Sequence, residues 1–290
     1  MKRIFTFVAV LVAAVVTAQA EVEFAYDAGA EIVSSYIWRG QYNGALSFQP
    51  DLEIGYDGEY TSLRIGAWGS LGASDWKFAK GLAHYIEDGT EINPNTRFMP
   101  ELDIVGRFSF FGASVGFNHY YYCDGTSFFN WKSAAEIDAL GSTSTTEVWA
   151  GYNFSHQFGD KVGLYINWYT TVAGADLVTD ENGDPKRAWS SYLEVGYSYT
   201  FEDLGLTLGA QVGMSPWESP IYGNSKFAVT NVSLKLDKEW EVGPCTIDLF
   251  AQASVNPDGI DKDNWFIWKA GDEKLYLQKL NGAIGLGFWF

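Results

Sequence analysis

The sequence predicts an all-β fold, a transmembrane up-and-down antiparallel β-barrel of about twelve strands, and three observations support this. The chain ends in a strand that alternates apolar with small or polar residues. Short and long connections alternate along the predicted strands. Hydrophobic residues make up 47% of the chain, yet no segment after residue 20 approaches the roughly 20 unbroken apolar residues of a membrane helix. Closed barrels can bury such strands in lipid because every backbone polar group is paired.

The terminal segment is typical of a closing barrel strand. Its even positions carry Leu280, Gly282, Ile284, Leu286, Phe288 and Phe290. At the edge of a soluble sheet such a strand invites aggregation, whereas in a barrel it closes against the first strand. We therefore expect Phe288 and Phe290 to form an assembly signal for the barrel-assembly machinery. An edge strand of a soluble sandwich is the alternative.

Residues 1–20 predict a secretory signal peptide. Lys2 and Arg3 precede an apolar run, and Ala18-Gln19-Ala20 forms a small-x-small cleavage site. We expect export through the periplasm with the help of chaperones, and one barrel domain over residues 21–290 in the lipid of a Gram-negative outer membrane. The formal net charge of −17 becomes −19 without Lys2 and Arg3, which argues against nucleic acid as a partner.

Alternation and turn signals place each strand in order. The strands are expected at residues 23–38, 46–56, 63–71, 98–110, 112–123, 145–158, 161–172, 189–201, 205–214, 226–240, 244–255 and 280–290. Five tight turns are expected at Asp57-Gly58, Phe111-Gly112, Gly159-Asp160, Glu202-Asp203 and 241–243. The six other connections are longer, and the longest is residues 72–97. This asymmetry predicts short periplasmic turns, long extracellular loops and both termini on the periplasmic side.

The face opposite the apolar one is expected to line a lumen. The candidate pore-lining residues are Asp51, Glu53, Arg64, Glu101, Asp103, Arg107, Glu147, Glu194, Lys235 and Asp248. Asp27, Asp237 and Lys279 share this face, and Glu53 is expected to face Arg64. Arg39 and Glu31 are candidates for a constriction. The excess of acids predicts a potential that favours cations. A salt-bridged plug with no through-path is the alternative.

Aromatic residues at strand ends predict girdles at the two membrane interfaces. The periplasmic set is Tyr56, Tyr60, Phe110, Phe158, Phe201, Trp240 and Phe290, and the extracellular set is Trp38, Tyr121, Trp168 and Trp189. A sugar-binding aromatic stripe is the alternative.

Motifs for catalysis or metal binding are sparse. His84, His119 and His156 lack zinc spacing, and no GxSxG elbow is present. Asp180, Asn182 and Asp184 resemble half a calcium loop but lack its bidentate Glu, so they are weak calcium candidates. No cofactor is expected. Cys123 and Cys245 are predicted at opposite barrel ends, too far apart for a disulfide.

One stretch of the sequence resembles a specific protein family. The segment Ser34-Ser35-Tyr36-Ile37-Trp38-Arg39-Gly40, with Gly55–Ser70 (GYDGEYTSLRIGAWGS), resembles the TorF-type porin family of Gram-negative bacteria. The resemblance covers mainly residues 31–70. It implies an outer-membrane barrel with a transport role and supplies no catalytic residues.

Three functions follow as hypotheses. The first is a passive, cation-leaning channel for small polar solutes, which is not an enzyme. The second is a non-conducting barrel whose extracellular loops bind a partner or stabilise the envelope. The third is an outer-membrane lipid hydrolase that uses His119 or His156 on the outer wall. An interfacial histidine without a catalytic role is the favoured interpretation of both residues.

Overall fold

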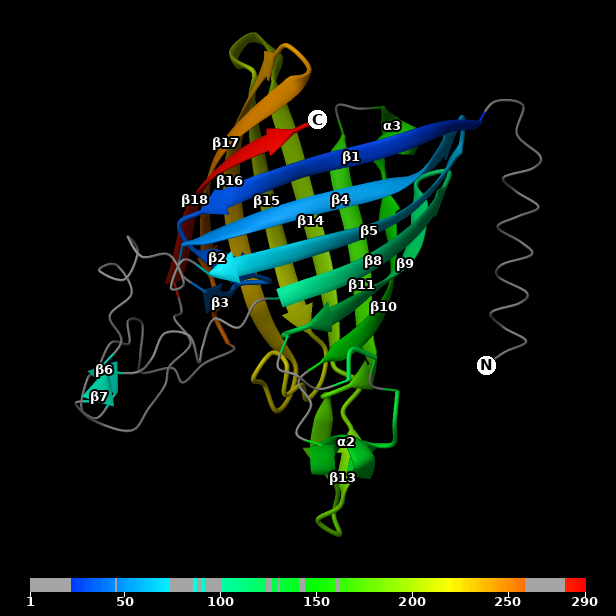
Figure 1. The fold of residues 1–290 in the computed structure, drawn as a ribbon, viewed down its shortest axis with the longest axis vertical. Helices are drawn as coiled ribbons and strands as arrows, with labels where there is room; N and C mark the ends of the chain where they lie inside the picture. Colours follow the sequence, from blue (N-terminus) through cyan, green and yellow to red (C-terminus); the bar gives the residue numbers. More distant parts are fainter. Residues whose placement is uncertain are drawn as a thin grey trace.

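Twelve strands form one closed antiparallel barrel in the computed structural model (Figure 1). The structure describes residues 22–44, 46–72, 86–87, 90–91, 101–123, 127–129, 131–140, 144–159, 162–258 and 280–290. The strands follow one another around the barrel in chain order, and the last pairs with the first. The predicted fold class and strand number are confirmed. The predicted signal peptide, His84, Lys279 and most of loop 72–97 lie outside the described residues.

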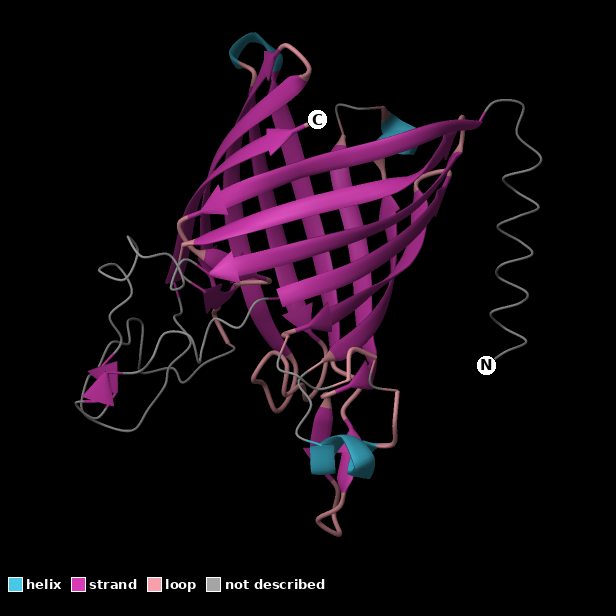
Figure 2. Cartoon of the chain, viewed as in Figure 1, coloured by secondary structure: helices cyan, strands magenta, loops and turns pink. Residues whose placement is uncertain are grey.

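The barrel strands are β1 (Val22–Val33), β4 (Ser47–Gly58), β5 (Thr61–Gly72), β8 (Glu101–Phe110), β9 (Ala113–Tyr121), β10 (Thr145–Asn153), β11 (Gly163–Gly174), β14 (Ser191–Phe201), β15 (Leu206–Ser215), β16 (Ala228–Val242), β17 (Cys245–Val255) and β18 (Leu280–Trp289). Three small hairpins lie outside the ring: β2 (Tyr36–Trp38) with β3 (Gln41–Gly44), β6 (Ile86–Glu87) with β7 (Thr90–Glu91), and β12 (Leu177–Thr179) with β13 (Pro185–Arg187). The short helices are α2 (Ala134–Leu140), α3 (Ser155–Phe158) and η4 (Glu202–Leu204) (Figure 2). No described helix has the length and apolar character needed to cross a membrane.

The apolar face of the strands is the outer face. In β4, Leu52, Ile54 and Tyr56 are 50%, 45% and 50% exposed, while Asp51 and Glu53, at the alternate positions, turn inward. This distribution is the reverse of a soluble protein, in which large apolar side chains are buried. It is the distribution of a barrel whose outer surface meets lipid and whose interior is polar.

The two barrel ends differ. At one end, here called the turn end, Tyr60 and Phe111 belong to two-residue connections, and Gly243 belongs to a third. Val22 pairs with Gly58 at this end, and the C-terminus also lies toward it (Figure 1). The longer connections lie at the opposite end, here called the loop end. The predicted asymmetry of the connections is therefore confirmed. Cys123 and Cys245 lie at opposite ends and do not form a disulfide.

The barrel closes where β18 pairs with β1. Gly29 lies opposite Trp289 and Ala30 opposite Phe288, and the backbone N–H of Phe290 donates to the Ala28 carbonyl at 2.8 Å. A Cβ atom on Gly29 would meet the Trp289 ring and lie 2.6 Å from the Phe288 carbonyl oxygen. The close approach of β1 and β18 therefore requires glycine at position 29.

Gly29→Leu is expected to destabilise barrel closure by about 1–3 kcal/mol, because it overpacks this seam. The measurement is urea unfolding in detergent micelles, followed by the mobility shift of folded barrels on unheated gels. Gly282→Leu is the matched control, because Gly282 of β18 faces outward and the nearest atom to its Cβ position lies 3.7 Å away. An equal loss of stability in both variants would contradict this account of the seam.

Two predicted strand boundaries are wrong. Residues 155–158, expected to end a strand, form α3, and β10 ends at Asn153, before Phe154. The first strand does not reach Trp38. It ends at Val33, Ser34 and Ser35 form a bend, and β2 and β3 make a separate hairpin. We call residues 36–44 the lumen hairpin, because its tip reaches side chains on the inner barrel wall.

Candidate functional site: the lumen constriction

The lumen hairpin turns through Arg39 and Gly40. Their φ values of +48° and +81° are both left-handed, as expected for a two-residue hairpin turn with glycine at its second position. A Cβ on Gly40 would lie 2.7 Å from the Thr230 carbonyl oxygen of β16, so the turn rests directly on the barrel wall. Asn281 Nδ2 donates to the Gly40 carbonyl at 2.9 Å, and Gln41 Nε2 donates to the Ile221 carbonyl at 3.0 Å.

The tip of the hairpin makes a buried ion pair with β10. Arg39 Nη2 lies 2.6 Å from Glu147 Oε1, and Arg39 Nη1 donates to Glu147 Oε2 at 2.9 Å. The two side chains are only 8% and 4% exposed. Arg39 Nη1 also donates to the Tyr222 hydroxyl at 2.6 Å. This bidentate geometry is the strong form of an arginine–carboxylate contact and fixes the position of the tip.

Aromatic rings surround the same guanidinium. Arg39 Cζ lies 3.9 Å from the ring centroid of Tyr169, 4.6 Å from that of Trp38 and 4.8 Å from that of Tyr192. Tyr169 and Tyr192 project from β11 and β14, whereas Trp38 belongs to the hairpin. Cations over aromatic faces are attracted by the ring quadrupole, more strongly where water is excluded. We call Glu147, Tyr169, Tyr192 and Tyr222 the Arg39 receptor.

The receptor is held by other wall residues. Glu147 Oε1 also accepts hydrogen bonds from Asn118 Nδ2 at 2.8 Å and from the Tyr120 hydroxyl at 2.7 Å. The Tyr192 hydroxyl accepts one from Asn231 Nδ2 at 3.2 Å, and a Cβ on Gly213 would collide with the Tyr192 ring. The carboxylate and the Tyr192 ring are thus positioned by groups on β9, β15 and β16 that do not belong to the hairpin, whereas Tyr222 also stacks on Trp38 of the hairpin at 5.8 Å.

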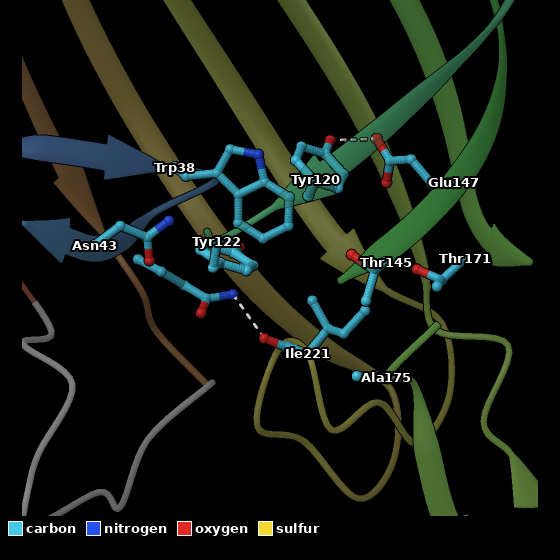
Figure 3. Close-up of a pocket in the computed structure, with 10 residues that line it drawn as sticks. Trp38, Asn43, Tyr120, Tyr122, Thr145, Glu147, Thr171, Ala175 and Ile221 are labelled. Atoms are coloured by element: carbon cyan, nitrogen blue, oxygen red, sulfur yellow. Dashed lines mark hydrogen bonds between the residues drawn. The ribbon is translucent and has the colours of Figure 1, made fainter. Parts of the chain in front are cut away.

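A cavity of about 200 Å³ opens beside the ion pair, toward the loop end. It is lined by hairpin residues Trp38, Gln41 and Asn43 and by wall residues that include Tyr120, Tyr122 and Glu147. Figure 3 shows Trp38 and Tyr120 side by side above the cavity, with the Tyr120 hydroxyl on Glu147. The cavity therefore lies between residues at the loop end, such as Ala175 and Ile221, and the Glu147 carboxylate.

The constriction residues predicted from sequence are only partly brought together. Arg39 reaches across to the inner wall, but its partner is Glu147 and not Glu31. Glu31 lies on β1 opposite Gln49 and Gly287. Trp38, expected in the extracellular girdle, lies instead on the lumen hairpin together with Tyr36, which packs against the Trp68 ring at 5.3 Å. The reason is the bend at Ser34-Ser35, which turns both residues inward.

The other predicted lumen residues do face inward, with different pairings. Glu53 lies opposite Gly66 and pairs with Arg107 at 3.2 Å. The predicted contact between Glu53 and Arg64 is therefore wrong, because Arg64 pairs with Asp57 and, at 3.4 Å, with Asp27. Lys235 lies 2.6 Å from Asp237 and over the Phe250 ring.

The remaining acids of the predicted set are mostly buried in the wall. Glu101 and Asp103 of β8 are each 5% exposed, and Asp248 of β17 is 7% exposed. Glu194 accepts a hydrogen bond from Gln211 Nε2 at 3.1 Å. By strand parity, the inner face of the described strands carries the acids Glu23, Asp27, Glu31, Asp51, Glu53, Asp57, Glu101, Asp103, Glu147, Glu194, Asp237, Glu239, Glu241 and Asp248 and the bases Arg64, Arg107 and Lys235, and the lumen hairpin adds Arg39. Fourteen acids against four bases leave the interior negative.

The receptor tyrosines were not predicted as site residues. Strand alternation could have indicated some of them. Tyr169 lies on the same polar face as Asn167 in β11, and Tyr192 lies on the same face as Glu194 in β14. Their neighbour Tyr120 likewise shares a face with Asn118 in β9. Parity places a tyrosine in the lumen, but it does not say which charge lies against the ring. Tyr222 belongs to a loop and carries no periodic signal.

His119 is less accessible than expected. It has the outward parity of Phe117, yet it is 0% exposed, because Phe128 and Phe129 cover it with ring centroids at 4.8 and 4.5 Å. Its Nδ1 lies 2.8 Å from Thr146 Oγ1, and its Nε2 lies 2.6 Å from the Phe128 carbonyl oxygen. His156 lies in α3 and not on a strand. The geometry of His119 is that of a histidine that anchors a loop to the wall.

The weak calcium candidates form a turn between β12 and β13. Asp180 Oδ1 accepts the backbone N–H of Asn182 at 2.8 Å and of Asp184 at 3.0 Å. These two donors hold the pKa of the Asp180 carboxyl below its usual value. In the part of the chain that the structure describes, no three His, Cys, Asp or Glu side chains are grouped to hold a metal ion. The turn geometry thus accounts for Asp180 without a cation.

The periplasmic aromatic set predicted from sequence is exposed at the turn end. Its members are between 41% and 64% exposed: Tyr56, Tyr60, Phe110, Phe158, Phe201, Trp240 and Phe290. Such exposure is expected of rings that lie at a membrane interface.

No protein-family model matches this chain, and no curated protein matches its sequence. Solved outer-membrane barrels are similar in structure at low identity. The NanC porin is 9% identical, with a TM-score of 0.45 over 92% of this chain and 99% of that chain. An outer membrane channel from Pseudomonas putida F1 is 12% identical, with a TM-score of 0.43 over 92% and 94%. Salmonella typhi OmpF is 11% identical, with a TM-score of 0.38 over 93% and 97%.

Proposed function

We propose that the protein is a passive channel of the Gram-negative outer membrane that carries small polar solutes and favours cations. The single observation that carries this proposal is the unbalanced charge of the interior, where the described residues place fourteen acids against four bases on the inner face. A channel lined by one sign of charge concentrates counter-ions and repels co-ions. The apolar outer face supplies the membrane location.

Water in the lumen is the second requirement, because ionised groups are costly to bury without it. Arg107 and Glu53 pair on the inner wall with side chains 43% and 22% exposed, and Lys235 is 40% exposed. These groups are hydrated within the barrel toward the turn end. Nearer the loop end, Arg39 and Glu147 are almost fully buried, so the lumen hairpin leaves them little water. The proposed solutes are small for this reason.

Membership of the TorF-type family, an assembly signal at Phe288 and Phe290, and transient periplasmic partners belong to the same proposal. The proposal gives no residue a catalytic role. A lipid hydrolase finds little support, because both ring nitrogens of His119 are already engaged.

Ion selectivity in a planar bilayer tests this function. In a potassium chloride gradient, the refolded protein should give discrete current steps and a reversal potential of cation-selective sign. Neutralising two lumen acids, in Asp51→Asn/Glu53→Gln, should move the reversal potential measurably toward the anion side. Asp180→Asn/Asp184→Asn is the matched control, because it removes two charges from a loop outside the lumen. An unchanged potential in the lumen variant, or a shift of equal size in both, would count against the proposal.

A second function is favoured by one observation, the near-complete burial of the Arg39–Glu147 pair. If the lumen hairpin closes the path, the barrel does not conduct, and its loops bind a partner or stabilise the envelope. A correctly folded barrel that stays silent in the bilayer would support this function in place of the channel.

A further inference from the structure

The Arg39 receptor has the complete chemistry of a guanidinium-binding site. Glu147 offers two oxygens to two nitrogens, Tyr222 offers a third acceptor, and the rings of Tyr169 and Tyr192 lie over the planar cation. A planar, charged group with a fork of donors is what such a set recognises. In this structure the cation is supplied by the chain itself, from the tip of a two-stranded hairpin.

The receptor does not depend on Arg39 for its shape. Asn118 and Tyr120 hold the Glu147 carboxylate, and Asn231 holds the Tyr192 hydroxyl, all from the barrel wall. Glu147 would keep these two donors if Arg39 were absent. The rings also contact one another without Arg39, because Tyr192 packs against Tyr169 at 6.1 Å and against Tyr222 at 5.2 Å. The site is therefore preorganised, which lowers the cost of binding a separate ligand.

A cavity lies beside the receptor on its loop-end side. The cavity of about 200 Å³ shares Trp38 and Glu147 with the Arg39 site. A pocket of this size is smaller than those that hold drug-sized ligands, at roughly 300 Å³ or more. It has room for the remainder of a small solute whose cationic head lies against Glu147.

We infer that Arg39 is an internal ligand that occupies a binding site for small organic cations with a guanidinium head. This inference rests on the proposed channel function and names its solute class. A guanidinium solute that enters through the cavity exchanges with Arg39 on Glu147, and the lumen hairpin moves away from the wall. No bond is made or broken in this exchange, and one cation replaces another.

Removing the internal ligand should uncover the site. Arg39→Ala and Arg39→Gln are refolded in detergent micelles, and methylguanidinium binding is measured by isothermal titration calorimetry. Each variant should bind methylguanidinium at least tenfold more tightly than the wild type does. Adding Glu147→Gln to Arg39→Ala should remove this gain, and the neutral, isosteric methylurea should not bind to the Arg39→Ala barrel.

Arg107→Ala is the matched control. It also deletes one lumen arginine and frees one carboxylate, that of Glu53, but in the part of the chain that the structure describes no aromatic ring lies over Arg107. Equal affinity of Arg39→Ala and Arg107→Ala for methylguanidinium would overturn the inference, as would equal binding of methylurea. Failure of both Arg39 variants to fold would also overturn it, because the receptor would then depend on Arg39. If the barrel binds methylguanidinium but carries no current, the inference about the binding site stands and the proposed channel function is refuted.

Discussion

Trypsin is expected to cleave the Glu147→Ala variant after Arg39 at a rate about 100-fold or more above that of the wild type. Without Glu147 the guanidinium is left in a buried site with no carboxylate, which costs about 3–5 kcal/mol. The hairpin can avoid this cost by leaving the wall, so that Arg39 regains water. Each 1.4 kcal/mol changes the docked fraction about tenfold, and the exposed fraction rises accordingly.

The measurement is limited trypsin digestion in micelles, with the fragment ending at Arg39 quantified by mass spectrometry. Glu53→Ala is the matched control. It removes the partner of Arg107, but that pair is 43% and 22% exposed, and the arginine lies within β8. Its loss should leave cleavage after Arg39 unchanged, because exposed pairs contribute about 0–1 kcal/mol. Protection of Arg39 in the Glu147→Ala variant would show that other contacts hold the hairpin.

Gly40→Val is expected to displace the lumen hairpin to a similar degree. The residue has φ +81°, and a β-branched side chain there costs about 1–3 kcal/mol. The new Cβ would also lie 2.7 Å from the Thr230 carbonyl oxygen, an atom of the wall backbone that cannot move aside easily. Cleavage after Arg39 and the unitary conductance should both rise.

Gly183→Val separates the two causes of this effect. Gly183 has φ +87° in the turn between β12 and β13, but no atom lies within 4 Å of its Cβ position. It therefore carries the same backbone strain without the collision. We expect little change in conductance or in cleavage after Arg39 from this control. If Gly40→Val behaved like Gly183→Val, the contact between the turn and β16 would not be needed for docking.

The barrel itself could be predicted because its signal is local. Each strand repeats with a period of two, and each turn carries its own residues, as at Phe111-Gly112. The lumen hairpin could not be predicted in this way. Ile32, Ser34, Tyr36 and Trp38 continue the alternation of β1, so periodicity alone cannot separate a longer strand from a strand, a bend and a hairpin. In the sequence, the place where the strand ends is marked only by the pair Ser34-Ser35, which also fits the alternation.

The ion pair between Arg39 and Glu147 could not be predicted from the sequence for a different reason. Arg39 and Glu147 are 108 residues apart, and their contact exists only once the barrel has closed and the hairpin has turned inward. The sequence analysis grouped Arg39 with Glu31 as constriction candidates, and Glu31 is the lumen acid nearest to Arg39 along the chain. Proximity along the chain has little bearing on proximity inside a barrel, because the inner wall brings every strand toward a common axis.

The most direct test of the central claim, that the lumen hairpin constricts a conducting barrel, is the unitary conductance with and without that hairpin. Val33 and Ser47 are paired neighbours, so a short Gly-Ser turn can replace residues 34–46 without strain on β1 or β4. Both proteins are expected to conduct, with unitary steps several-fold larger after the replacement. Equal steps would contradict a constriction at Arg39, and silence of both folded barrels would contradict the channel.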